Sequence, residues 1–137
     1  MKHPDRDNER LSAMRVQVRS ILDALCEGTG VREFNEEDFE VSLDEYPIFV
    51  RALEQPPAVM MYREVADELP CSAAMTRMLN EHNATHILFR GTWEDKSVFI
   101  RADIPAEPLV AGQLQLVLES FEKETELLAA KLEDWIE

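Results

Sequence analysis

The chain has 137 residues, enough for one hydrophobic core of ordinary size. Its 28 acidic and 14 basic side chains give a net charge of -14, and 45% of the residues are hydrophobic, as in a folded globular protein. So negative a chain cannot bind the phosphate backbone of nucleic acid through clustered basic residues, and it is unsuited to an anionic membrane surface. We therefore expect no direct contact with nucleic acid or membrane.

The cysteines and the N-terminal residues indicate the compartment. Cys26 and Cys71 are isolated and form no Cys-x-x-Cys motif, which is typical of reduced thiols rather than of disulfides or zinc ligands. Residues 1–10 are polar and lack the apolar segment of a signal peptide, and no apolar run reaches the roughly 20 residues of a membrane span. The sequence therefore predicts a cytoplasmic protein.

The first half of the chain predicts one helix and three strands. We expect residues 1–10 to form a flexible tail and residues 11–137 a single domain. Apolar side chains recur at three- and four-residue steps from about residue 9 to residue 27, which predicts a helix that ends at the following glycines. Phe39, Val41 and Leu43 alternate with polar residues, as in a strand with one buried face. Two further strands, about 48–54 and 58–66, are bounded by prolines.

The second half predicts a short helix, a hairpin and a long helix. Ser72 is placed to cap the short helix, and strands at about 85–93 and 96–103 are joined tightly at Glu94-Asp95. The last helix is expected from about residue 107 to residue 136, roughly 45 Å long. Its apolar end must bend back onto the domain or contact a second subunit, and we expect a homodimer; the residues concerned are Leu128, Leu132, Trp135 and Ile136.

Two short segments resemble a known family. They are Leu79-Asn80-Glu81-His82-Asn83 and Arg101-Ala102-Asp103-Ile104-Pro105-Ala106, and they resemble the YbjN family of the actinobacterial type, which is structurally similar to the type III secretion chaperones. The resemblance implies an α+β fold with an antiparallel sheet in the order α-β-β-β-α-β-β-α. It also implies a cytosolic, non-enzymatic and often dimeric protein that binds peptide segments of other proteins.

The sequence offers no catalytic, metal or cofactor site. No serine lies in a nucleophile-elbow motif. His82 and His86 have a spacing that could serve a metal on a helix, but a helix end and a strand start are expected between them, and no third ligand is near. Asn80 and Asn83 are expected to close the short helix. We therefore predict no enzyme activity and no cofactor.

One repeated pattern predicts a binding surface. In each of four expected strands a large apolar residue is followed two positions later by arginine, and a two-residue step places both on one face of a strand. The opposite face, which includes Ile48, Val50, Ile87, Phe89, Val98 and Ile100, is expected to pack beneath the helices. The candidate partner-binding residues are Phe49, Arg51, Met61, Arg63, Leu88, Arg90, Phe99 and Arg101.

This pattern has structural explanations as well as a functional one. The arginine stems can shield apolar side chains from water, or the acidic last helix can cover the face within one subunit. The functional interpretation is a docking surface for an acidic-apolar peptide or a partner's helix, with guanidinium groups that orient carboxylates.

Two functions follow from the sequence. The leading prediction is a cytosolic, non-enzymatic protein- or peptide-binding module, chaperone- or adaptor-like, which acts as a homodimer. The alternative is an acidic regulatory protein that occupies a basic site on a nucleic-acid-binding partner, because the acidic residues between 33 and 45 form a run without a basic residue.

Overall fold

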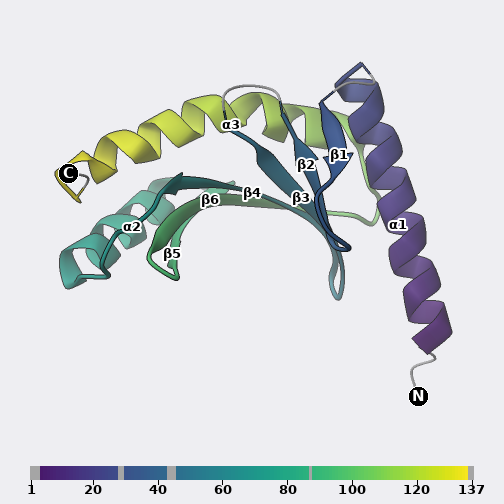
Figure 1. The fold of residues 1–137 in the computed structure, drawn as a ribbon, viewed down its shortest axis with the longest axis horizontal. Coiled ribbons are helices and arrows are strands. Elements are labelled where there is room, and N and C mark those ends of the chain that lie inside the picture. The colour runs from purple at the N-terminus through teal and green to yellow at the C-terminus, as the bar shows by residue number, and fades with distance from the viewer. Residues whose placement is uncertain (1–3, 28–29, 43–45, 87, 136–137) are drawn as a thin grey trace. The chain divides into compact units, whose positions relative to one another are not determined.

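The computed structural model describes residues 4–27, 30–42, 46–86 and 88–135, with side chains from residue 9 onward. Figure 1 shows the elements in chain order. Their bounds are α1 Pro4–Leu25, β1 Val31–Glu33, β2 Asp38–Val41, β3 Ile48–Glu54, β4 Pro57–Ala66, α2 Ala73–Thr85, β5 Phe89–Glu94, β6 Ser97–Pro105, α3 Ala111–Leu132 and a 3-10 turn at Glu133–Trp135. None of these helices is long and apolar enough to span a membrane.

The strands form one six-stranded sheet in the order β1-β2-β3-β4-β6-β5. The pairs β1–β2, β2–β3 and β5–β6 are antiparallel, so the predicted α+β class with an antiparallel sheet is confirmed. The short strand β1 is an addition to the predicted order. Its residue Val31 lies opposite Val41 of β2, but three residues are too few to show an alternating pattern in the sequence.

The chain divides into two compact units. Unit 1 comprises Met1–Met61 and Asp103–Gln115, and unit 2 comprises Tyr62–Ala102 and Leu116–Glu137. Three elements, β4, β6 and α3, contribute residues to both. The expectation of a single domain over residues 11–137 stays a prediction.

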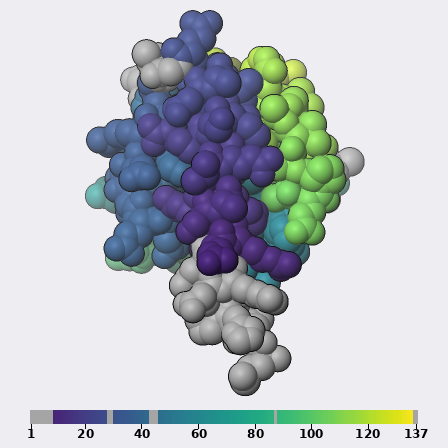
Figure 2. All heavy atoms as spheres, turned by 90° about the vertical axis from the view of Figure 1, so that its right-hand side faces the viewer, coloured from purple at the N-terminus to yellow at the C-terminus, as the bar shows by residue number. Residues whose placement is uncertain are grey.

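In unit 1, helix α1 packs against β3 through its apolar stripe. Val18 and Leu22 of α1 are fully buried, and so is Val50 of β3. The guanidinium group of Arg15 lies 4.8 Å from the centre of the Phe39 ring, so that α1 also covers β2. The helix begins at Pro4, earlier than its apolar spacing indicated, because proline fits the first turn of a helix. Figure 2 shows the exposed side of α1, in purple.

In unit 2, α2 and α3 pack on one face of the β5–β6 hairpin. A Cβ atom at Gly91 would lie 3.0 Å from side-chain carbons of both Leu79 and Leu128, so the two helices approach β5 where it has no side chain. Beside them the rings of Phe89 and Phe121 meet edge to face at 5.0 Å. The core of unit 2 therefore lies on this face of the hairpin, and the other face is free of these two helices.

Asn83 closes the outer edge of β5 rather than the end of a helix. Helix α2 continues past it to Thr85. The Asn83 amide donates to the Gly91 carbonyl at 2.9 Å and accepts from the Gly91 N–H at 2.8 Å. One side chain thus pairs both backbone groups at the middle of an edge strand, where unpaired groups would otherwise be open to another chain. The helix-closing role expected for Asn83 is wrong for this reason.

Helix α3 is shorter than its pattern indicated. Its 22 residues correspond to about 33 Å rather than 45 Å, and a 3-10 turn follows it. Leu128 and Leu132 are fully buried and Trp135 is half-buried, while Ile136 lies outside the described residues. Of the two alternatives for these side chains, the burial of Leu128 and Leu132 favours packing on the same chain over a contact with a second subunit.

Candidate functional site

The structure separates the eight predicted binding residues into two groups. Phe49, Arg51, Arg90, Phe99 and Arg101 alternate with buried neighbours along β3, β5 and β6 and reach the surface, and Leu88, just before β5, is 39% exposed. In each unit we call this side of the strands the open sheet face of that unit. Met61 and Arg63 lie on the opposite, helix-covered side.

The face predicted for Met61 and Arg63 is wrong. Their exposed fractions are 0% and 2%, and they continue the buried series that begins at Val59. The sequence around them, Val59-Met60-Met61-Tyr62, is apolar on both faces of the strand, so a period of two residues could not say which face is buried. Met60 and Tyr62 take the half-exposed positions instead.

Arg63 belongs to the core of unit 2. Its guanidinium carbon lies 5.8 Å from the centre of the Phe121 ring, and its Nη1 atom donates to the Thr125 hydroxyl at 3.4 Å. Both partners are on α3, so this arginine connects β4 to the helix above it. It cannot take part in a docking surface.

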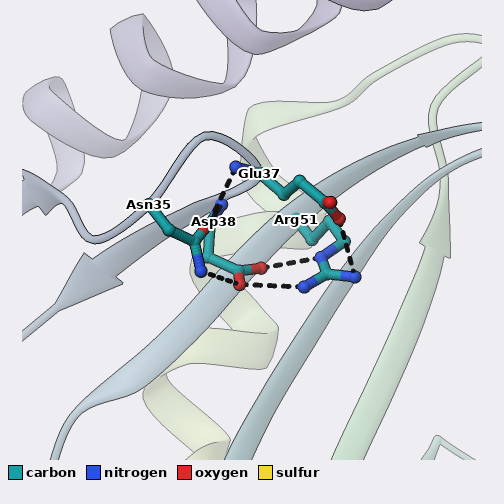
Figure 3. Close-up of polar contacts among 4 residues, drawn as sticks. All are labelled: Asn35, Glu37, Asp38 and Arg51. Atoms are coloured by element: carbon teal, nitrogen blue, oxygen red, sulfur yellow. Dashed lines mark hydrogen bonds and ion pairs between the residues drawn. The ribbon is translucent and has the colours of Figure 1, made fainter.

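In unit 1, Arg51 is fully engaged by acidic side chains (Figure 3). Its Nε and Nη2 atoms donate to the two carboxylate oxygens of Asp38 at 2.8 and 2.9 Å, and its Nη1 atom lies 3.0 Å from a carboxylate oxygen of Glu37. Asp38, opposite Arg51 on β2, is only 1% exposed. This is a bidentate ion pair around a buried carboxylate, and it leaves Arg51 little capacity to bind a partner's carboxylate.

Asn35 extends this network into the β1–β2 loop. Its Nδ2 atom donates to Asp38 at 3.0 Å, and its Oδ1 atom accepts from the backbone N–H groups of Glu37 and Asp38 at 2.8 and 2.7 Å (Figure 3). An asparagine that bonds the backbone two residues later forms an Asx-turn. The loop is therefore held in one conformation by the same side chains that bind Arg51.

The start of this loop places an exposed aromatic side chain against a half-buried one on β3. Phe34, 53% exposed at the end of β1, places its ring centre 4.9 Å from that of Phe49 at an interplanar angle of 60°. The Phe34 N–H donates to the Asp38 carbonyl at 2.9 Å, which fixes its backbone. We call Phe34 and Phe49 the aromatic patch. Sequence reasoning missed Phe34, because a lone aromatic in an acidic run shows no period.

In unit 2, the open sheet face forms an ordered array of three rows. The register of β5 and β6 places Arg90 opposite Arg101, Thr92 opposite Phe99, and Glu94 opposite Ser97. Strand β4 continues two rows: the Tyr62 ring lies 6.3 Å from the Phe99 ring, and Glu64 accepts from the Ser97 hydroxyl at 2.6 Å. We call this array the charge grid; its rows are Arg90 and Arg101, then Tyr62, Phe99 and Thr92, then Glu64, Ser97 and Glu94.

The charge grid is basic at one end and acidic at the other. Glu94 is four positions after Arg90 along β5, which is about 13 Å at 3.3 Å per residue. Arg90, Glu64 and Glu94 are exposed, and the aromatic row between them is half-buried. Sequence reasoning missed Tyr62 and Glu64, because it placed the wrong face of β4 outward. It missed Glu94 because it placed that residue in the hairpin connection, whereas Glu94 is the last residue of β5.

His82 is buried in unit 2, where its ring contacts Lys131 and His86. Burial, with further contributions from Lys131 and His86, lowers the pKa of His82 to about 4. Its Nδ1 atom lies 2.9 Å from Lys131 Nζ, and its ring stacks on His86 at 3.9 Å. In the part of the chain that the structure describes, no three His, Cys, Asp or Glu side chains converge as metal ligands. The cluster connects α2 to α3.

A comparison with protein-family models shows the family. The family model described as T3SS (YopN, CesT) and YbjN peptide-binding chaperone 1 matches residues 12–136. No curated protein matches. Similar folds occur in the crystal structure of the ExsC-ExsE complex (TM-score 0.67, 15% identity, 84% of this chain and 92% of that chain). They also occur in the Yersinia pestis type III secretion chaperone SycH in complex with a stable fragment of YscM2 (TM-score 0.57, 16% identity, 80% and 97%). The chain thus belongs to the family of type III secretion and YbjN peptide-binding chaperones.

Proposed function

We propose that this protein is a cytoplasmic, non-enzymatic, chaperone- or adaptor-like module that holds a segment of another polypeptide and acts as a homodimer. Family membership supports the peptide-binding role, and the two similar structures are both complexes of a protein with a second protein or fragment. The observation that carries the proposal in this chain is the aromatic patch. A phenylalanine that is 53% exposed contributes little to the core, and it is held in place by the ion-pair network around the buried carboxylate of Asp38.

The aromatic patch has the properties of a binding anchor. Aromatic side chains contribute a large apolar area with few rotatable bonds, and they dominate the energetics of protein interfaces. The Asn35–Asp38–Arg51 network fixes the loop before a partner arrives, so binding does not have to order it. An apolar side chain of the bound segment would contact Phe34 and Phe49 together.

In this proposal the predicted contact residues of unit 2 contact the second copy of the homodimer rather than the held segment. Leu88, Arg90, Phe99 and Arg101 present apolar and basic groups on the same side of the hairpin. Arg51 does not act in this way, since its guanidinium group is bound by Asp38 and Glu37. Its role is to hold Phe34 and Phe49 at the surface.

The test uses a phage-displayed library of random peptides panned on the full chain. An enriched peptide is synthesised, and its affinity for the variants is measured by fluorescence anisotropy. Phe34→Ser should weaken binding about 10- to 100-fold, as expected for an interface anchor. Val16→Ser on α1, at an apolar side chain that is 71% exposed, is the matched control and should bind as the wild type does. Unchanged binding by Phe34→Ser, or no enriched peptide, would contradict the proposal.

The acidic regulatory alternative has one specific observation in its favour. Glu36 lies exposed on the β1–β2 loop, and among the described residues no basic side chain pairs with it. If the protein occupied a basic site on a nucleic-acid-binding partner, binding would weaken steeply with added salt. Docking through the aromatic patch predicts weak salt dependence and a negative heat-capacity change. Titration calorimetry at two salt concentrations separates these functions.

A further inference from the structure

We propose that the charge grid of unit 2 is the seam of the homodimer, occupied by the charge grid of a second copy. The inference rests on the homodimer of the proposed function and names its interface. It does not concern the aromatic patch, which lies in unit 1.

The grid is an incomplete surface in the isolated chain. Arg90 is exposed, and among the described residues no carboxylate lies within ion-pair distance of it. Directly opposite Arg90 on β6 is Arg101, and like charges at opposite positions of neighbouring strands are destabilising. Tyr62 and Phe99 remain half-exposed beside them. A partner that brings a carboxylate to Arg90 and apolar groups to the middle row would pair the Arg90 guanidinium group and cover the exposed parts of both rings.

A second copy of the same face supplies both. A two-fold axis that lies in the interface along the row of Tyr62, Phe99 and Thr92 turns the basic row of one copy over the acidic row of the other. Arg90 then meets the partner's Glu94, and Glu94 meets the partner's Arg90, while the aromatic rows contact each other. This is an isologous contact, in which one surface is complementary to itself. An axis parallel to the strands would instead place arginine on arginine.

The spacing of the grid suits this arrangement. Two sheets pack face to face about 10 Å apart with nearly aligned strands, so rows separated along the strand remain in register across the interface. A single peptide strand with one charge sign could satisfy only one end. The second copy satisfies both ends in one contact, which is why we assign it as the occupant.

The grid also sets the strength of the dimer. Its eight side chains are fewer than the 20–30 residues that each partner usually contributes to a stable interface. We therefore expect a concentration-dependent dimer with a dissociation constant on the order of micromolar. Exposed ion pairs at its rows make the dimer weaker as salt increases.

Charge exchange between positions 90 and 94 tests the seam. Sedimentation equilibrium is measured on the full chain for the wild type, for Arg90→Glu, for Glu94→Arg, and for an equimolar mixture of the two variants. Each variant alone should dimerise at least about tenfold more weakly, because both symmetric pairs become repulsive. The mixture should regain dimer, because a carboxylate introduced at position 90 of one copy meets a guanidinium introduced at position 94 of the other.

Matched controls carry the same charge changes on α2. Arg77→Glu and Glu81→Arg are exposed, lie outside the grid and should dimerise as the wild type does. A wild type that dimerises although the mixture stays monomeric, or single variants that dimerise normally, would overturn the seam and leave the proposed homodimer standing. A wild type that is monomeric at every concentration would overturn both. If Arg90→Glu dimerises normally but no longer binds the panned peptide, the grid is a peptide site and the inference is wrong.

Discussion

Arg51 in unit 1 and Arg90 in unit 2 have the same sequence context but different interactions. Each follows a large apolar residue by two positions, and each lies on the open sheet face of its own unit. Across the strand from Arg51 is the buried carboxylate of Asp38, whereas across from Arg90 is Arg101. The first arginine is therefore bound within its own chain, and the second remains available to a partner.

The difference shows that the neighbouring strand, rather than the residue itself, decides what an arginine on a sheet does. A guanidinium opposite a buried carboxylate stabilises the fold, because removal of either partner leaves an uncompensated buried charge. A guanidinium opposite another cation is tolerated only at a solvent-exposed position or at an interface. Arg63 is a third case. Its side chain is buried against Phe121 beneath α3 and forms part of the core.

The largest expected effect on stability comes from removal of the ion pair between Arg51 and Asp38 in unit 1. Arg51→Ala should lower the free energy of unfolding by roughly 3–5 kcal/mol, because Asp38 would stay buried without its bidentate partner. Urea unfolding followed by circular dichroism measures the change. Arg90→Ala is the matched control and should leave the unfolding midpoint nearly unchanged. Equal losses for the two variants would contradict the difference between them.

A smaller effect on the free energy of unfolding comes from His82 in unit 2, and it depends on pH. The pKa of His82 is about 4 in the folded chain against 6.5 in the unfolded chain. Between pH 4 and pH 6.5 His82 is protonated in the unfolded state but not in the folded state. Its contribution to the free energy of unfolding is therefore fully present above pH 6.5 and is lost as the pH falls toward 4. The loss is up to about 3 kcal/mol. Its cause is burial first, then the positive charge of Lys131 at 2.9 Å.

His82→Asn isolates this contribution. An asparagine amide oxygen can accept from Lys131 as the Nδ1 atom does, but it does not titrate. The difference in unfolding free energy between wild type and variant, measured from pH 7 to pH 4, should therefore narrow as the pH falls. A constant difference over that interval would show that His82 titrates normally in the folded chain.

Much of the fold was predictable because its helices and strands carry clear periods. The stripe of α1 and the hairpin of β5 and β6 were found from spacing alone. Strand β1 was not, since three residues show no period, and the outward face of β4 was misassigned because Met60 and Met61 are equally apolar.

The candidate site was less predictable, because it depends on which strands are neighbours. The strand register places Asp38 opposite Arg51 and Arg90 opposite Arg101. The residue pattern of one strand does not show which residues of the neighbouring strand lie opposite it. Phe34 carries no signal in the sequence at all. Its importance comes from the loop network of Asn35 and Asp38, which only the structure shows.

The central claim is that the open sheet face of unit 1 binds polypeptide through the aromatic patch. Its most direct test is NMR on the full chain, in which amide chemical shifts are followed as the panned peptide is added. We predict the largest changes at Phe34, Phe49 and their strand neighbours in β1 to β3, and small changes on the outer side of α2. Changes confined to the helices, with the signals of Phe34 and Phe49 unmoved, would contradict the account.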